Sequence, residues 1–169
     1  VARYADTAGD GADYPVREAV KYRDWVIRAF NSDQPFDDFI RDQIAGDIRA
    51  LSGPTEEFAS RVTATGFLAI GKRYGYKPSP DYQHLDFADV IDSIGRSLLG
   101  LSLGCARCHN HKFDPIPTAD YYALAGILHS TRTADRVFMN NVNVSGWTET
   151  DLTMDTDARA LVAAHQSRV

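Results

Sequence analysis

Two cysteines and a histidine stand close together in the second half of the 169-residue chain, in the run Cys105-Ala106-Arg107-Cys108-His109. The pattern C-x-x-C-H is the attachment signature of c-type haem. Thiols at positions i and i+3 of a helical turn face the same way, so both can add to the vinyl groups on one edge of haem. The next residue can then bind the iron as proximal ligand. The motif therefore predicts one covalently bound haem c, held by Cys105, Cys108 and His109.

Two other chemistries use closely spaced cysteines, and both fit this sequence less well. A dithiol redox pair normally belongs to a βαβ pattern, which the sequence does not show. A structural zinc site could add His111 to the three motif ligands, but zinc ligands usually come in two pairs separated by a connecting segment. The chain contains only these two cysteines, so a disulfide framework is excluded.

The propionates of a haem need cationic or hydrogen-bonding partners, because an unpaired buried carboxylate is costly. Arg107 and Lys112 are the nearest cations in the sequence, and Arg3 and Arg96 are further candidates. A solvent-facing charge is the alternative for each of them. Tyr121 and Tyr122 are expected to pack near the haem, with one hydroxyl available as a donor, although ordinary core positions stay open for both.

The motif does not specify the sixth ligand of the iron. Met139 ranks first, His129 second and Met154 third, each with a core or surface position as the alternative. If the helix before the motif is continuous, His84 lies about 37 Å from His109 at 1.5 Å per residue, which argues against it as a ligand unless the helix breaks at one of its glycines. A five-coordinate iron is the other alternative, and it would favour ligand binding or catalysis over electron transfer.

The elements that must position the motif are helical. Apolar residues recur at helical spacing along most of the chain. The predicted helices are 17–30, 36–48, 55–70 with Thr55 as N-cap, 86–108, 119–129 with Thr118 as N-cap, and a polar helix at 155–166. A loop is expected at 71–83 and irregular chain at 131–154. The predicted fold is mainly α: one helical domain over residues 1–169, with a core of residues 1–130 around one haem and an irregular C-terminal segment, 131–169.

Two packing expectations follow from the same spacing. Five apolar residues of the first helix should lie mostly on one stripe: Val20, Trp25, Val26, Ile27 and Phe30. Of these, Trp25 and Phe30 are assigned to the core. Gly95, Gly100 and Gly104 recur along one side of the long helix, where another backbone or a flat ligand could approach closely.

Composition limits the classes of partner. The net charge is −5 and no cluster of Lys and Arg is visible, which argues against nucleic acid. No apolar run approaches the ~20 residues that a membrane span needs. The opening residues look like the interior of a longer polypeptide.

Acidic residues are numerous in the first third of the chain and could build a hydrolase site. Roles as helix caps and as partners of Arg are preferred for these residues, which are Asp6, Asp24, Asp37, Asp38, Asp42 and Asp47.

Several blocks of sequence resemble the planctomycete cytochrome-associated domain family. The blocks are Arg3–Asp6, Tyr22–Asn31, Pro35–Phe39, Gln43–Asp47, Ala64–Phe67, Gly104–Pro115 and Tyr121–Tyr122. The resemblance implies an exported, haem-bearing domain with a redox role, within a large protein that often carries a further c-type haem domain. Asn110 stands where the family usually has Asp.

Motif and resemblance together predict an electron-transfer domain with one haem c. The expected partner is a redox protein or a neighbouring haem domain of the same polypeptide. A periplasmic or extracellular location is expected, because c-type haem is attached outside the cytoplasmic membrane. The alternatives are a haem enzyme or a ligand-binding or sensing domain with an open distal site, and a purely structural haem. Whether the chain is an enzyme is therefore left open.

Overall fold

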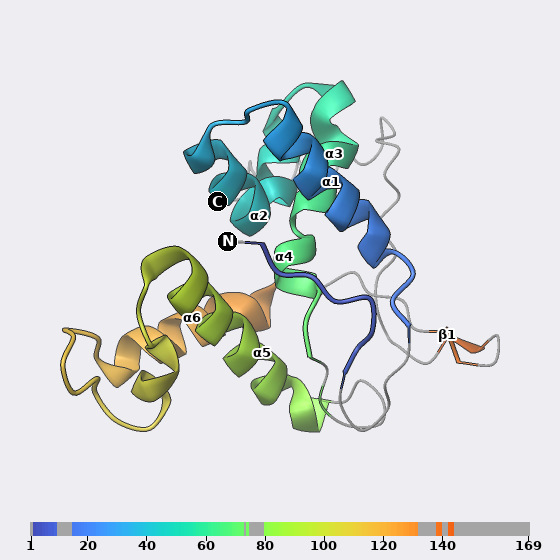
Figure 1. The fold of residues 1–169 in the computed structure, drawn as a ribbon. Helices are drawn as coiled ribbons and strands as arrows, with labels where there is room; N and C mark the ends of the chain where they lie inside the picture. Colours follow the sequence, from blue (N-terminus) through green and yellow to red (C-terminus); the bar gives the residue numbers. More distant parts are fainter. Residues whose placement is uncertain are drawn as a thin grey trace, which may run out of the picture. The chain divides into compact units, whose positions relative to one another are not determined.

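The computed structural model describes residues 2–9, 15–72, 74, 80–131, 138–139 and 142–143, and within these the chain is mainly α, as predicted (Figure 1). The α-helices are α1 (Ala19–Asn31), α2 (Phe36–Ser52), α3 (Phe58–Ala64), α4 (Gly66–Ala69), α5 (Pro80–Ile94) and α6 (Thr118–Ser130). Shorter turns are η1 (Thr55–Glu57), η2 (Gly95–Leu99) and η3 (Leu103–Arg107). Residue contacts divide the predicted single domain into two compact units, each described by itself.

The first unit contains α1, α2 and α3. Its aromatic core stacks Trp25 on Phe39, with ring centroids 5.1 Å apart. Tyr22 is also buried, and its hydroxyl donates to the side-chain oxygen of Gln43 at 2.6 Å. A buried amide costs stability unless its polar atoms are bonded, so this pair gives α1 and α2 a defined register.

The predicted stripe on α1 is wrong. The buried face carries Tyr22, Trp25 and Ala29, which recur at i, i+3 and i+7. Phe30, assigned to the core, is 67% exposed and touches Phe39 only edge-on. Ile27 is also exposed. Small Ala29 can lie against a neighbouring helix where a larger side chain would not fit, which a hydrophobicity pattern does not register.

The third predicted helix, 55–70, is divided into η1, α3 and α4. Pro54, and not Thr55, occupies the cap position, and Thr55 begins the 3₁₀ turn. The Thr65 hydroxyl donates to the Val62 carbonyl at 2.7 Å between α3 and α4. Threonine side chains bond to nearby backbone in this way and compete with helical hydrogen bonds.

The second unit contains α5, η2, η3 and α6, and α6 packs against α5, which it crosses at a wide angle in Figure 1. The continuous helix predicted at 86–108 is wrong. The chain leaves α5 through one π-turn, η2, and reverses at Gly100, whose φ is +67°. Glycine adopts this left-handed conformation without the steric cost of a Cβ. A shared core of Ile91, Leu103, Ala106 and Tyr121 then joins α5, η3 and α6.

The remaining elements differ from prediction in smaller ways. The loop predicted at 71–83 ends earlier, because α5 begins at Pro80. Proline is favoured at the first helical position, where no amide hydrogen is needed. No strand was predicted, but β1 (Phe138–Met139) and β2 (Val142–Asn143) form a short antiparallel pair. The predicted helix at 155–166 lies outside the described residues. None of the described helices is both long and apolar enough to cross a membrane.

Candidate functional site

The turn η3 sorts the motif residues onto two faces. In a 3₁₀-helix, residues i and i+3 lie one above the other. Leu103 and Ala106 are buried, whereas Cys105 and Cys108 are exposed and free. Leu103 and Ala106 therefore anchor the turn in the core, while the thiols of Cys105 and Cys108 remain accessible to solvent. Two exposed thiols in this relation are accessible to an external reagent.

Close backbone packing holds η3 against α5. A methyl group at Gly95 would lie 2.6 Å from the Leu101 carbonyl oxygen, and one at Gly104 would lie 3.2 Å from an Asp92 carboxylate oxygen. The predicted close neighbour is therefore confirmed at Gly95, where it is the returning backbone, and at Gly104, where it is the Asp92 side chain, but not at Gly100, where a methyl group would meet nothing within 4 Å. Glycine is required here because the turn that carries the thiols folds back directly onto the preceding helix.

His109 presents a free ring nitrogen. The ring is exposed, and its Nδ1 lies 2.7 Å from the backbone oxygen of Asn110. A carbonyl only accepts, so Nδ1 is the donor in this bond. Metal-binding histidines are commonly oriented by such a bond from the other ring nitrogen. Among the described residues Nε2 has no hydrogen-bond partner, so it is available to a ligand outside the chain.

His111 is used differently. Its side chain is only 7% exposed, and its Nδ1 accepts the backbone N–H of Asp114 at 2.9 Å. Its Nε2 lies 2.9 Å from the Ser102 hydroxyl. The Asp114 carboxylate is 3.2 Å from the same Nδ1, but an Nδ1 that accepts a backbone hydrogen is uncharged, so we assign no ion pair. Both nitrogens thus stabilise the turn, which removes His111 from the alternative zinc ligand set.

Metal-binding clusters of three or more His, Cys, Asp or Glu side chains are absent from the parts of the chain that are described. The zinc alternative therefore gains no support from geometry.

Asn110 connects the motif to α6. Its backbone oxygen orients His109, and its side-chain oxygen accepts the N–H of Thr118 at 2.9 Å. Thr118 was predicted to cap α6, but it is the first residue of the helix and makes no side-chain cap bond. The cap is supplied from eight residues upstream. An Asp at this position would also offer a side-chain oxygen to the Thr118 N–H. Asn and Asp can therefore both make this cap bond.

Two substitutions test this role of Asn110. Asn110→Ala should lower the free energy of unfolding by about 1 kcal/mol, because an amide of the first helical turn loses its acceptor. Asn110→Asp should be neutral or stabilising by about 0.3–1 kcal/mol, since a carboxylate is favoured at a helix N-terminus. Urea unfolding of the full chain, followed by circular dichroism, measures both. Equal destabilisation by the two variants would contradict the capping role.

The predicted propionate partners separate into two groups. Arg3 pairs with Asp89, and Arg96 pairs with Asp92 at 2.7 Å, which also raises the pKa of Arg96. Carboxylates of α5 therefore already engage both cations. Arg107 and Lys112 form no ion pair within the described chain, and the Lys112 amine lies 5.2 Å from the centre of the Phe113 ring. The assignment of Arg107 and Lys112 to haem stays a prediction.

The two tyrosines of α6 point to opposite environments. Tyr121 is buried beneath the motif against Ala106, and burial raises the pKa of its hydroxyl. Tyr122 is 57% exposed, and its hydroxyl donates to the backbone oxygen of Arg107 at 3.1 Å. The structure gives Tyr121 the core position that was the alternative for it; its predicted contact with haem is untested. Tyr122 is the tyrosine that reaches the surface beside the thiols.

Of the three ranked distal ligands, His129 is the one whose side chain the structure describes. His129 is exposed and packs edge-on against Phe87 of α5, with centroids 6.2 Å apart. Met139 lies in β1, but its side chain is outside the described atoms, as is all of Met154. The argument against His84 required a continuous helix, and the helix breaks between Gly95 and Gly100, which was the stated exception. η3 packs near Asp92, and His84 precedes that residue by eight positions, about 12 Å along α5.

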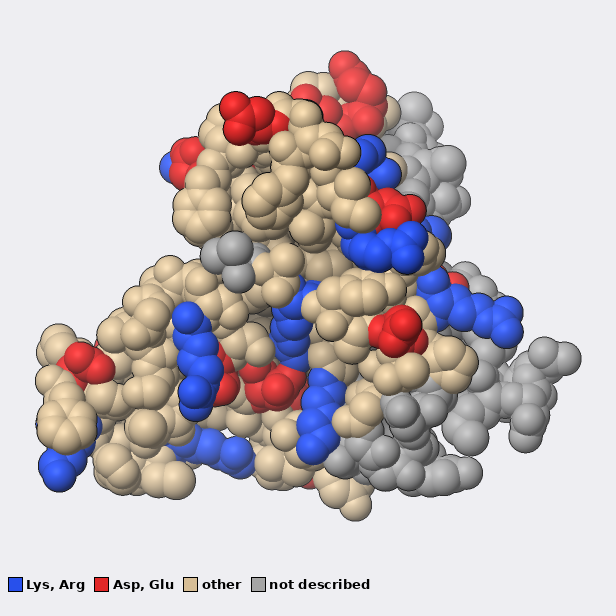
Figure 2. All heavy atoms as spheres, in the orientation of Figure 1, with Lys and Arg blue, Asp and Glu red and all other residues tan. Residues whose placement is uncertain are grey.

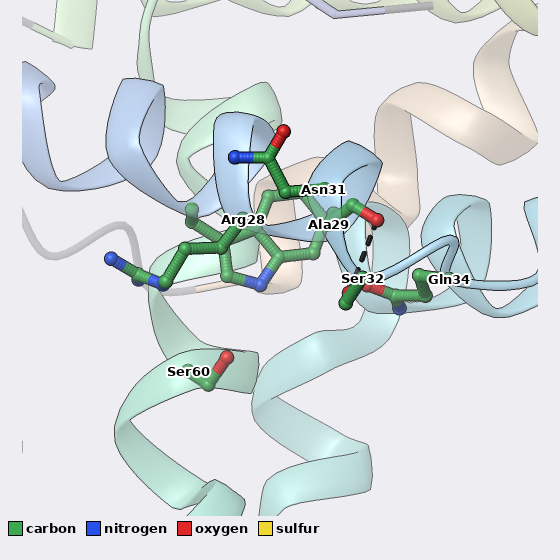
Figure 3. A pocket seen from close by; sticks show the side chains of 7 residues that line it. Arg28, Ala29, Asn31, Ser32, Gln34 and Ser60 are labelled. Carbon is green, nitrogen blue, oxygen red and sulfur yellow. Dashed lines mark hydrogen bonds between the residues drawn. The ribbon is translucent and has the colours of Figure 1, made fainter.

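A pocket of about 480 Å³ lies in the first unit (Figure 3). It is lined by Trp25, Arg28, Ala29, Asn31, Ser32, Gln34 and Ser60. The Ser32 hydroxyl donates to the Ala29 carbonyl at 3.2 Å, and the Gln34 amide donates to Asp42 at 2.9 Å. These groups complete the end of α1. With no histidine, cysteine or acid in its lining, the pocket offers no reaction chemistry.

The acidic residues of the first unit have structural partners. Arg49 bonds to Asp38 at 2.9 Å and to Asp42 at 2.6 Å, and Arg41 bonds to Asp37. The preference for Arg partners over a hydrolase pair is confirmed for these three acids. On the face drawn in Figure 2, basic and acidic groups are interspersed and neither sign forms a broad patch.

Sequence reasoning missed two residues that build the site. Asn110 was noted only as a departure from a family pattern, and its capping bond spans a loop that no local rule predicts. Tyr122 was treated together with Tyr121. The helical spacing could have separated them, since adjacent residues differ by about 100° around a helix axis.

Comparison with known proteins places the chain in a family without giving a reaction. The model of the family PSCyt2, described as a protein of unknown function (DUF1549), matches residues 1–133. No curated protein and no solved structure matches the chain. The matched part contains α1 to α6 and the whole C-x-x-C-H motif, and it ends close to the boundary predicted at residue 130. The chain therefore belongs to PSCyt2, a planctomycete-associated family whose function is not known.

Proposed function

We propose that this chain is an electron-transfer domain that carries one haem c, attached through Cys105 and Cys108 with His109 as the proximal ligand. The redox partner is a separate protein or a neighbouring haem domain of the same polypeptide. The location is periplasmic or extracellular, where c-type haem is attached.

The observation that carries the proposal is the different state of the two motif histidines. His109 is exposed and has its Nδ1 bonded at 2.7 Å, and its Nε2 has no hydrogen-bond partner among the described residues. His111, two residues later, has both ring nitrogens engaged. Only the histidine that directly follows the second cysteine is therefore prepared to bind iron, as the C-x-x-C-H signature requires.

The donor set fits haem in other respects. Both thiols are exposed, that of Cys105 within η3 and that of Cys108 at its C-terminal cap. Each could add across a vinyl double bond, so that sulfur bonds to one vinyl carbon and the thiol hydrogen goes to the other, with no leaving group and no net oxidation. Arg107 and Lys112 flank the site as cations for the propionates. When bound, the haem would supply one-electron exchange at its iron.

The direct test is expression of the exported chain together with the cytochrome c maturation machinery. We expect a haem stain that survives denaturing electrophoresis, one haem per chain by pyridine haemochrome, and a low-spin absorption spectrum. A weak band from methionine bound to iron would favour Met139 or Met154 over His129 and His84. Covalent haem with a high-spin spectrum would overturn electron transfer in favour of ligand binding. No covalent haem would overturn the whole proposal.

A matched pair of histidine variants tests the assigned ligand. His109→Ala should shift the haem spectrum, because the iron loses its imidazole, and added imidazole should restore the spectrum. His111→Ala should leave the spectrum unchanged. It should instead lower the free energy of unfolding by about 1–3 kcal/mol, because the partners of a nearly buried ring are left unsatisfied. Absorption spectra and urea unfolding separate the two effects, and an identical spectral shift in both variants would contradict the assignment.

A further inference from the structure

Helix α6 carries apolar residues on two opposite faces. Its inner face packs Tyr121, Leu124, Ala125 and Leu128 into the core with α5 and η3. Its outer face is also largely apolar, with exposed Ala119, Tyr122, Ala123, Gly126 and Ile127, and the exposed polar residues of the helix, Asp120, His129 and Ser130, lie near its two ends. A helix at a protein surface normally places polar residues outward, and an all-round apolar helix is normally covered. Tyr122 and Ile127 are 57% and 61% exposed, so the described part of the chain leaves most of their surface uncovered.

The outer face adjoins the haem-attachment motif. The Tyr122 hydroxyl donates to the backbone oxygen of Arg107, the residue that directly precedes Cys108. The Tyr122 ring meets the Tyr121 ring edge-on at 5.3 Å, and Tyr121 packs against Ala106 of the motif. Contacts therefore run without interruption from the turn that bears the thiols to the exposed side of α6.

We propose that the outer face of α6, formed by Tyr122, Ala123, Gly126 and Ile127, is the wall against which the porphyrin plane lies. The inference rests on the proposed function, because it requires haem at Cys105 and Cys108. It adds the surface that binds the ring, which the motif does not specify.

The shape and the position of this face select haem over other occupants. A methyl group added at Gly126 would meet nothing within 4 Å, and Ala123 is small and exposed, so a flat group can approach the helix backbone there. Tyr122 and Ile127 supply larger apolar surfaces beside them. A porphyrin is flat and largely apolar, and covering these residues removes apolar area from water. The adjoining thiols would hold that particular ligand at this place.

The first experiment compares the oxidation of two tyrosines by hydroxyl radicals. Tyr122 and Tyr82 are exposed by 57% and 43%, and Tyr82 lies in the first turn of α5, ten residues before Asp92. In the haem-loaded chain, oxidation of Tyr122 should fall severalfold relative to the chain with Cys105→Ala and Cys108→Ala. Oxidation of Tyr82 should be the same in both.

The second experiment introduces a charge into the wall. Ala123→Glu should lower the yield of attached haem, and in the molecules that are loaded it should lower the reduction potential and weaken the Soret circular dichroism. Gln83→Glu is the matched control, because it adds the same side chain at an exposed position of α5. Far-ultraviolet circular dichroism checks that both variants keep their helices.

The outcomes distinguish the wall from the proposed function. Covalent haem in the unmodified chain, with Tyr122 unprotected and Ala123→Glu behaving like the control, would overturn the wall and leave electron transfer standing. Protection of Tyr122 that depends on protein concentration would assign the face to a second copy of the chain and also overturn the wall. Absence of covalent haem from the unmodified chain would overturn both.

Discussion

Replacement of both cysteines by alanine is expected to reduce covalent haem from one per chain to none. The chain has only these two cysteines, so no other thiol can form the bond. Each single variant should keep one attachment point and a reduced yield. Because both side chains are exposed, the substitutions remove no core contact, and the helix content should be unchanged. Haem staining after denaturing electrophoresis and circular dichroism measure these two results.

Ser52→Ala provides a control for the cysteine variants. Ser52 is an exposed residue at the end of α2, and its substitution likewise removes one side-chain heteroatom, but in the other unit. Its haem yield should equal that of the unmodified chain. A double cysteine variant that still retains haem through denaturation would contradict attachment at the motif.

Gly46→Ala is expected to lower the free energy of unfolding by about 1–3 kcal/mol, since overpacking a close contact forces the backbone to move. Gly46 is buried in α2 where α3 crosses it, and a methyl group there would overlap the backbone oxygen of Arg61. Backbone cannot rotate away as a flexible side chain can. The loss should outweigh the ~1 kcal/mol by which alanine is favoured over glycine within a helix. Urea unfolding, followed by circular dichroism and tryptophan fluorescence, measures the change.

Gly126→Ala is the matched control for this stability prediction. It makes the same substitution within a helix, at a position where the new methyl group meets nothing within 4 Å. Measured in the haem-free chain, it should be neutral or stabilising by up to about 1 kcal/mol, as helix propensity alone predicts. Destabilisation of the same size by both substitutions would show that packing against α3 is not the cause.

The mainly α fold could be predicted from sequence because apolar spacing at a period near 3.6 reports helices directly. The break after α5 could not be predicted, because three glycines in a helical pattern have no unique meaning. Gly100 adopts positive φ to reverse the chain, whereas Gly95 makes room for the returning backbone. Both roles depend on contacts that form only after the chain has turned. The predicted core position of Phe30 was wrong for a similar reason. The small residue Ala29 occupies the buried face of α1, and Phe30 is exposed.

At the site, the motif alone identified Cys105, Cys108 and His109, because their chemistry depends on spacing within five residues. The supporting residues could not be found in that way. The bond from Asn110 to Thr118 and the bond from Tyr122 to Arg107 join positions eight and 15 residues apart. Each depends on how η3 returns toward α6. Local rules treat a helix cap as the adjacent residue, so they chose Thr118 and overlooked Asn110.

The reversal at Gly100 also has a consequence for how this part of the chain folds. It lets α5, η3 and α6 assemble from one contiguous stretch, residues 80–130, so the contacts around the motif join positions close in sequence. Low contact order of this kind accompanies fast folding, on the order of microseconds to milliseconds for helical proteins. We therefore expect α5, η3 and α6 to fold before the slower covalent attachment of a prosthetic group is complete. Because both thiols still face solvent when these elements have formed, attachment of a prosthetic group would not require the chain to be held unfolded.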